Sequence, residues 1–288
     1  MLPFRQILLP IDYSEPCLAV VPYAQDMLHH FDAELTLVHA YGPLAAAVLR
    51  GSQEDLIDPN FPERVRCSEQ ERLQLFAQHM FRGRRVGLVA ELGEPGCVVH
   101  KVAESERADL IMMATHGHGP VRRFLLGSVT AKVLHDASTV VWTGIGAGLT
   151  GHFPAIPYRS ILCALGDTSE AEAVLKAAAS LAGAYGAQLS LLHAVQTPVV
   201  GRADFNSYKK ELIDEAYNRL RELKQKLNID APVSVVDAPV AEGVREMALR
   251  RKADLVVTGR GHCQDTMSRM WSHLYSIVRE SPCPVLSV

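Results

Sequence analysis

Short apolar runs alternate with longer amphipathic segments along the whole chain. In the first half, the apolar runs predict strands at residues 7–11, 35–40, 86–91, 110–113 and 140–142. Apolar side chains at helical spacing predict helices at residues 15–31, 68–82, 97–106 and 128–135. Residues 41–62 contain several proline and glycine breakers and are expected to form a loop. Strands that alternate with helices predict a parallel sheet with helices on both faces.

The same pattern occurs twice, because stretches of the first half recur in the second. Residues 7–11 (ILLPI) are matched by 161–165 (ILCAL), and residues 33–40 (AELTLVHA) by 187–194 (AQLSLLHA). Further on, residues 108–111 (ADLI) are matched by 253–256 (ADLV). We therefore infer a tandem duplication. The expected domains are residues 1–143 and 159–288, joined by a glycine-rich linker at 144–158, and each should contain a five-stranded parallel sheet.

Composition and charge narrow the class of protein. A chain of 288 residues with 48% hydrophobic and 21% charged residues suits two globular domains. The net charge of −3 gives no global electrostatic case for binding nucleic acid or an anionic membrane. No apolar window approaches the length of a membrane span, which is about 18 residues, and the first apolar run is too short for a signal peptide. The six cysteines form no CxxC pair, so we expect reduced, buried thiols in a cytoplasmic protein.

One stretch, residues 109–128 (DLIMMATHGHGPVRRFLLGS), carries the candidate chemistry. It begins as a buried strand, breaks at Gly117 and Gly119, and ends with Gly127 and Ser128 at the start of a predicted helix. A strand, a glycine loop and a helix N-terminus together aim backbone N–H groups at phosphate oxygens. In parallel sheets, ligands bind outside the carboxyl ends of the strands. Three residues lie at such ends: Asp12, Ala40 and Met113.

These residues resemble the universal stress protein family. The resemblance is carried by residues 7–15 (ILLPIDYSE), 37–40 (LVHA), 93–95 (GEP), 108–111 (ADLI) and 115–117 (THG), and it covers nearly the whole chain, once per half. It implies two Rossmann-like domains of the adenine nucleotide alpha hydrolase-like type. Nucleotide-binding members carry a motif of Gly, two residues, Gly, nine residues, Gly and then Ser or Thr. In the first half this frame is occupied by Ala114, Gly117, Gly127 and Ser128.

The resemblance implies ATP as the ligand, alone or with Mg²⁺, and it implies a role for each residue. Asp12 would lie near the ribose or adenine, and the adenine slot would be lined by Pro10, Ile11, Ala40 and Met113. The phosphates would be held by backbone N–H groups around Gly117, His118, Gly127, Ser128, Val129 and Thr130. Arg123 stands where the family often has a basic residue. Ala114 replaces a glycine, so ATP should fit if this position has ordinary strand geometry and should bind more weakly if it needs a positive φ.

The second half departs from this pattern. Gly259 falls on the first glycine of the motif, but Gly261 comes one position early. Trp271 and Ser272 fall on the positions of Gly127 and Ser128, and Gly166 falls on that of Asp12, with Asp167 beside it. A tryptophan at the phosphate cradle is expected to occlude it, so phosphate binding is expected in the first half alone.

The chain shows no Walker lysine and no nucleophile elbow. We therefore expect an ATP-binding regulatory protein of the stress response without fast catalysis. A slow ATPase and a ligand-free interaction scaffold are the alternatives. His116 and His118 flank Gly117, but their spacing is no known metal-ligand pattern, and no metal is expected. Family members pair through their final strands, so residues 140–142 and 285–288 are expected to pair as an intramolecular pseudo-dimer, with a homodimer as a further arrangement.

Overall fold

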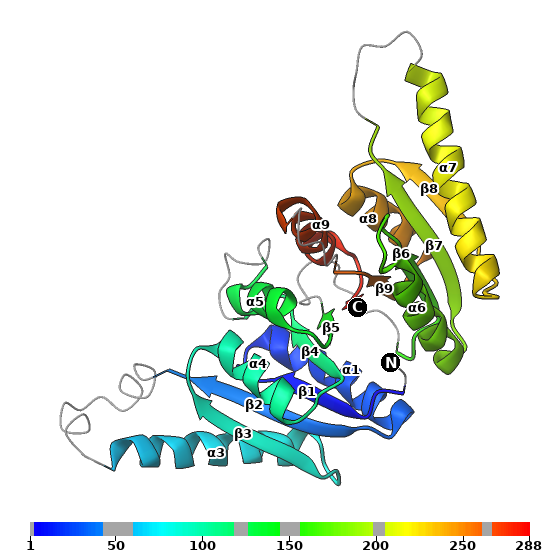
Figure 1. Ribbon diagram of the computed structural model, residues 1–288. Helices are drawn as coiled ribbons and strands as arrows, with labels where there is room; N and C mark the ends of the chain where they lie inside the picture. The colour runs from blue at the N-terminus through cyan, green and yellow to red at the C-terminus, as the bar shows by residue number, and fades with distance from the viewer. Residues whose placement is uncertain (1–2, 43–59, 118–125, 145–155, 198–204, 261–266) are drawn as a thin grey trace. The chain divides into compact units, whose positions relative to one another are not determined.

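Two compact units, one for each half of the chain, make up the computed structural model (Figure 1). The structure describes residues 3–42, 60–117, 126–144, 156–197, 205–260 and 267–288. Within these ranges each unit contains five strands that alternate with four helices. The fold class predicted from the alternating pattern is therefore confirmed.

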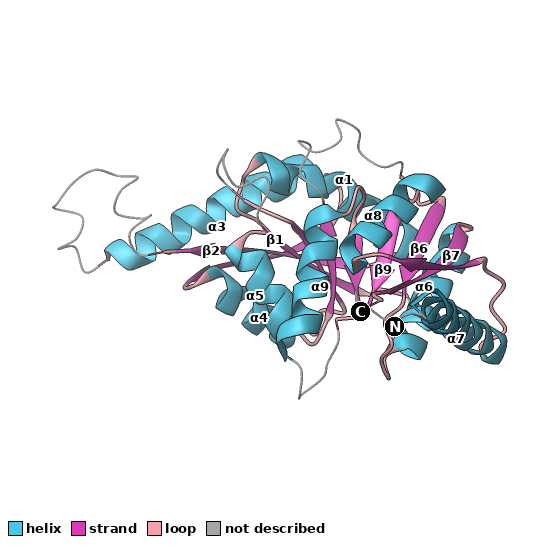
Figure 2. Ribbon diagram, turned by 90° about the horizontal axis from the view of Figure 1, so that it is seen from above, coloured by secondary structure: helices cyan, strands magenta, loops and turns pink. Residues whose placement is uncertain are grey.

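The first unit is a parallel sheet with strand order β3-β2-β1-β4-β5. Its elements are β1 (Gln6–Pro10), α1 (Glu15–Phe31), β2 (Glu34–Tyr41), α3 (Phe61–Met80), β3 (Val86–Leu92), α4 (Pro95–Ser105), β4 (Leu110–Ala114), α5 (Ser128–Asp136) and β5 (Val140–Gly144). Figure 2 shows α1 on one face of this sheet and α4 and α5 on the other. The central strands are buried on both faces, which explains their continuous apolar runs.

The second unit repeats this topology with strand order β8-β7-β6-β9-β10, again parallel. Its elements are β6 (Ser160–Ala164), α6 (Ala171–Tyr185), β7 (Gln188–Val195), α7 (Phe205–Lys226), β8 (Val233–Asp237), α8 (Val240–Arg251), β9 (Leu255–Thr258), α9 (Met267–Glu280) and β10 (Val285–Ser287). The duplication inferred from sequence therefore extends to the order of the strands.

Two expected boundaries need correction. Helix α3 begins at Phe61 rather than residue 68, because Pro62 lies in its first turn, where a missing N–H costs nothing. The expected linker, residues 144–158, overlaps both units. Gly144 is the last residue of β5, and Tyr158 is 1% exposed with its ring 5.1 Å from that of Tyr185. The predicted pairing of residues 140–142 with 285–288 stays a prediction.

The repeated Ala-Asp pair has a structural role. The Asp109 carboxylate accepts hydrogen bonds from the N–H groups of Arg5 (2.8 Å) and Gln6 (3.2 Å), at the start of β1. Asp254 does the same in the second unit, for Arg159 (2.8 Å) and Ser160 (3.1 Å). Each aspartate thereby fixes the first strand of its unit against the strand that follows the aspartate.

The cysteines only partly match the expectation of buried thiols. Cys17, Cys163 and Cys283 are buried, and burial raises the pKa of Cys17 and of Cys283 to about 12, so both stay protonated at neutral pH. Cys67 and Cys97 are exposed, which corrects the expectation for these two. All five are free thiols, and Cys263 lies outside the described residues.

Among the helices of the described ranges, none is long and apolar enough to cross a membrane.

Replacing Asp109 should destabilise the first unit. We expect Asp109→Ala to lower its free energy of unfolding by about 1–3 kcal/mol, because two backbone N–H donors lose a charged acceptor. Asp109→Asn keeps one acceptor oxygen and should cost less. Urea unfolding followed by the fluorescence of buried Trp142 measures this, in a Trp271→Phe background that removes the second of the two tryptophans. Equal stability of Asp109→Ala and the parent would contradict the assigned role.

Candidate functional site

The first unit has a crevice where its strand order reverses. The chain passes from β3, at one end of the sheet, to β4 on the far side of β1. Connections from neighbouring strands therefore leave in opposite directions beyond β1 and β4, which opens a crevice at their carboxyl ends. A pocket of about 340 Å³ lies there.

This pocket collects most of the predicted site residues. Eleven of the thirteen line it, namely Pro10, Ile11, Asp12, Ala40, Met113, Ala114, Gly117, Gly127, Ser128, Val129 and Thr130. The other two, His118 and Arg123, lie outside the described residues. Five further lining residues were not assigned to the pocket from the sequence: Cys17, Val38, Pro95, Val99 and His116. Pro95 and Val99 belong to α4, whose position over the crevice follows from the crossover rather than from any local motif.

Asp12 is fixed at the edge of the pocket. Its Oδ1 accepts hydrogen bonds from the Ser14 N–H (2.9 Å) and the Ser14 hydroxyl (2.6 Å). Gly117 lies against the other oxygen, since a Cβ at this position would clash with Asp12 Oδ2. The glycine therefore makes room for the carboxylate. A larger residue at position 117 would displace the Asp12 side chain.

Ala114 has ordinary strand geometry. It is the last residue of β4 and pairs with Gly144 of β5. The described residues with positive φ do not include it. Of the two outcomes foreseen for this position, the structure therefore gives the one in which alanine replaces glycine without backbone strain.

The start of α5 is tied to the end of β4. The Gly127 N–H donates to the Thr115 carbonyl (2.8 Å), and the Thr130 hydroxyl donates to the Ala114 carbonyl (2.9 Å). A Cβ at Gly127 would lie only 3.3 Å from the His116 Cα and the Thr115 oxygen, so a side chain would force the two segments apart. Gly127 also provides no capping side chain to α5. The first N–H groups of this helix therefore face the pocket as donors for an anion.

The loop after β1 is held by α3. Tyr13 has a positive φ of 62°, and the Arg72 guanidinium lies 3.8 Å from the centroid of its ring. The Tyr13 ring also lies 4.9 Å from that of His39, whose Nδ1 is 2.6 Å from the Ile11 carbonyl. Burial raises the pKa of Tyr13 to about 12, so the ring is neutral at pH 7. This cluster fixes Tyr13, the residue next to Asp12, and gives His39 a structural role.

His116 contributes a neutral imidazole to the pocket. Its ring is half-buried, and burial lowers its pKa. Its Nδ1 lies 3.1 Å from the Thr115 hydroxyl. The described residues contain no group of three or more histidine, cysteine, aspartate or glutamate side chains placed to hold a metal.

The second unit keeps the crevice but changes its lining. Gly166 replaces Asp12, and Asp167 pairs with Arg219 of α7 instead of facing the pocket alone. Helix α9 begins at Met267, so Trp271 is its fifth residue and does not precede the helix as Gly127 precedes α5. A cavity of about 430 Å³ remains at the strand ends. The Trp271 side chain lies outside the described residues, so its expected occlusion of the phosphate cradle stays a prediction.

Comparisons with known proteins agree with the repeat. The model of the universal stress protein family matches residues 3–143 and again residues 157–288. A universal stress protein of Thermus aquaticus is 30% identical over 136 residues, which are 46% of this chain and 93% of that protein. A putative universal stress protein of Staphylococcus haemolyticus is 29% identical over 140 residues, or 48% of this chain and 82% of that protein. The crystal structure of a universal stress protein from Archaeoglobus fulgidus is similar in fold, with a TM-score of 0.68, 19% identity, and coverage of 98% of this chain and 95% of that one.

The hydroxyl of Thr130 offers a test of how α5 is positioned. Thr130→Val keeps the shape of this buried side chain but removes the hydrogen bond to the Ala114 carbonyl. We expect a loss of about 1–2 kcal/mol in the free energy of unfolding of the first unit, since a buried carbonyl loses its donor. Thr130→Ser keeps the hydroxyl and is the matched control. Trp142 fluorescence in the Trp271→Phe background reports the result, and a Thr130→Val variant as stable as the parent would show that the bond does not hold the helix.

Proposed function

Since this chain belongs to the universal stress protein family, with two copies of the family's domain, we propose that it is an ATP-binding regulatory protein of the stress response. The first unit holds the nucleotide, and occupancy of that unit changes the conformation or the partners of the protein. The second unit does not bind phosphate.

The single observation that carries this proposal is the convergence of the motif residues on one pocket. Residues separated by more than a hundred positions, from Pro10 to Thr130, line a single crevice of about 340 Å³. One end is apolar, with Ile11, Val38 and Met113 among its walls, and suits a purine ring. The carboxylate of Asp12 lies where it can accept a hydrogen bond from a ribose hydroxyl.

The other end of the pocket suits phosphate. The N-terminus of α5 lies there without a capping side chain, so its N–H groups and its helix dipole favour negative charge. Ser128 is the first residue of this helix and adds a hydroxyl. Mg²⁺ would enter bound to the phosphates, since this cation is usually held by substrate phosphates, waters and one or two carboxylates.

The pocket supports binding better than turnover. The carboxylate and the imidazole among its described lining residues belong to Asp12, which already accepts two hydrogen bonds from Ser14, and to neutral His116. Fast hydrolysis needs a positioned base for the attacking water and positive charge at the leaving phosphate. We therefore expect ATP to be held with slow hydrolysis at most. The localisation in the cytoplasm and the pairing of the final strands remain predictions of the resemblance.

The first test is to identify what the protein retains. Protein purified without added nucleotide is denatured, and the released small molecules are identified by mass. We expect an adenine nucleotide, and calorimetry on the stripped protein should give one ATP per chain. Release of no small molecule, together with no heat on adding ATP, would support the ligand-free scaffold instead. Timed release of phosphate then separates a binding protein from an ATPase.

A pair of variants tests the assigned site. Asp12→Ala should weaken ATP binding about 10- to 100-fold, because loss of a hydrogen bond to a charged group costs about 1.5–3 kcal/mol and each 1.4 kcal/mol is tenfold. The control, Asp230→Ala, removes a fully exposed carboxylate of the second unit and should bind ATP as the parent does. Calorimetry measures both, and equal affinities of the two variants would place the nucleotide elsewhere.

A further inference from the structure

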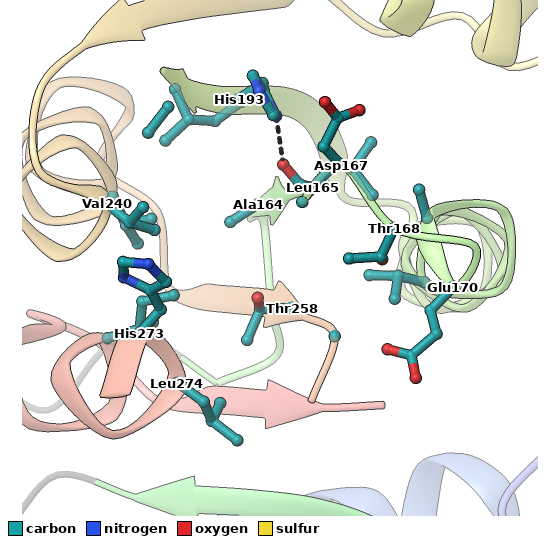
Figure 3. A pocket seen from close by; sticks show the side chains of 18 of the residues that line it. Ala164, Leu165, Asp167, Thr168, Glu170, His193, Val240, Thr258, His273 and Leu274 are labelled. Carbon is teal, nitrogen blue, oxygen red and sulfur yellow. Dashed lines mark hydrogen bonds between the residues drawn. The ribbon is translucent and has the colours of Figure 1, made fainter. Parts of the chain in front are cut away.

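The cavity of the second unit is larger than the pocket of the first and is open at the corresponding strand ends. It measures about 430 Å³ and lies among β6, β7, β9 and the helices α6 to α9 (Figure 3). Most of its wall is aliphatic, with Leu165, Val174, Val240, Val244 and Leu274 as examples. Small-molecule sites in proteins typically have this size and a mostly apolar lining.

Its polar positions differ from those of the first unit. The strand registers make the ends of β4 and β9 equivalent, so Thr258 stands where Met113 stands. Val141 of β5 and Val285 of β10 are equivalent, because each pairs with the same position of the neighbouring strand in its own unit. Counted back from these two residues, His273 of α9 is equivalent to Val129 of α5. Gly166 takes the position of Asp12. The second unit has thus lost the acid of the first and gained two hydrogen-bonding side chains, a hydroxyl and an imidazole.

These two side chains face the cavity from different elements. Figure 3 shows the Thr258 hydroxyl directed into it from β9 and the His273 ring directed into it from α9. His193, by contrast, uses its Nδ1 for the Leu165 carbonyl, 2.8 Å away. A mostly aliphatic wall with an inward hydroxyl and an inward imidazole suits a ring that has a hydrogen-bonding edge.

The charges around the cavity are balanced. Arg219 forms an ion pair with Asp167 at the mouth. Arg260 is 8% exposed, and burial lowers its pKa to about 10 while the negative charge of Glu170 acts in the opposite direction. Each arginine of the lining therefore interacts electrostatically with a carboxylate, Arg219 with Asp167 and Arg260 with Glu170. A ligand with several negative charges would meet those carboxylates, whereas an uncharged ligand leaves the balance undisturbed.

We propose that the second unit binds a small, uncharged heteroaromatic molecule, held by the apolar wall and by hydrogen bonds to Thr258 and His273, and that it does not bind nucleotides. The two halves of the chain then take different ligands. This inference does not depend on the ATP site proposed for the first unit.

Indole is the probe for the test, since it is an uncharged fused ring with one N–H donor. Ligand-observed NMR and calorimetry on the full chain should show saturable binding of one indole per chain. An excess of ATP should leave the indole bound. Binding that is not saturable, or displacement of the indole by ATP, would overturn the proposal.

Two matched substitutions locate the site. Ala194 at the end of β7 and Ala40 at the end of β2 occupy equivalent positions in the two pockets. Ala194→Phe should fill the second cavity and abolish indole binding without changing the affinity for ATP. Ala40→Phe should do the reverse. Indole binding that survives Ala194→Phe would contradict the assignment, and so would indole binding that is lost in Ala40→Phe.

A second pair tests the polar contacts if the bulky variants fail to fold. Thr258→Val and His273→Leu keep the size of each side chain roughly unchanged but remove its hydrogen-bonding group. Each should weaken indole binding about three- to tenfold, as expected for the loss of a hydrogen bond to a neutral group. The Thr258→Ser variant keeps the hydroxyl and should restore most of the affinity. Unchanged affinity in both Thr258→Val and His273→Leu would overturn the proposal.

Discussion

The reversal of strand order beside β1, with its counterpart beside β6, is the constraint on which both candidate sites depend. The strands on the two sides of this point send their connections in opposite directions, so the backbone cannot close over the carboxyl ends. Burial of the sheet on both faces holds those ends in place. The crevice is therefore a property of the topology, and it exists in both units whatever side chains line it.

What each crevice binds is decided by a few side chains on this shared backbone. In the first unit, Asp12 is fixed by Ser14, and the absence of a side chain at Gly117 makes room for it. In the second unit the corresponding acid is absent, and the aspartate beside it pairs with Arg219. A duplicated domain can diverge in this way because Asp109 and Asp254 fix the amino ends of the strands, away from the crevice at the carboxyl ends.

The sequence predicted the fold and most of the first pocket, because both follow from local patterns. Apolar runs predicted the strands, and the spacing of Gly117 and Gly127 predicted two residues that line the pocket. Residues on α4, such as Val99, could not be predicted, since a helix shows its own apolar face but not which crevice that face covers. The start of α3 was misplaced because Pro62 in the sequence predicts a helix break. In the structure it lies in the first turn of α3, where proline is tolerated. The second cavity was missed because its wall is assembled from single aliphatic residues of many elements.

Photoaffinity labelling tests most directly the claim that ATP binds in the first unit and not in the second. The full chain is irradiated with an ATP analogue that carries a photoreactive azide on the adenine, and the labelled peptides are identified by mass. The account predicts labels within residues 10–17, 38–41, 95–99 or 113–117 of the first unit, and protection by excess ATP. Protected labels confined to residues 164–171, 192–196 or 258–260 of the second unit would contradict it.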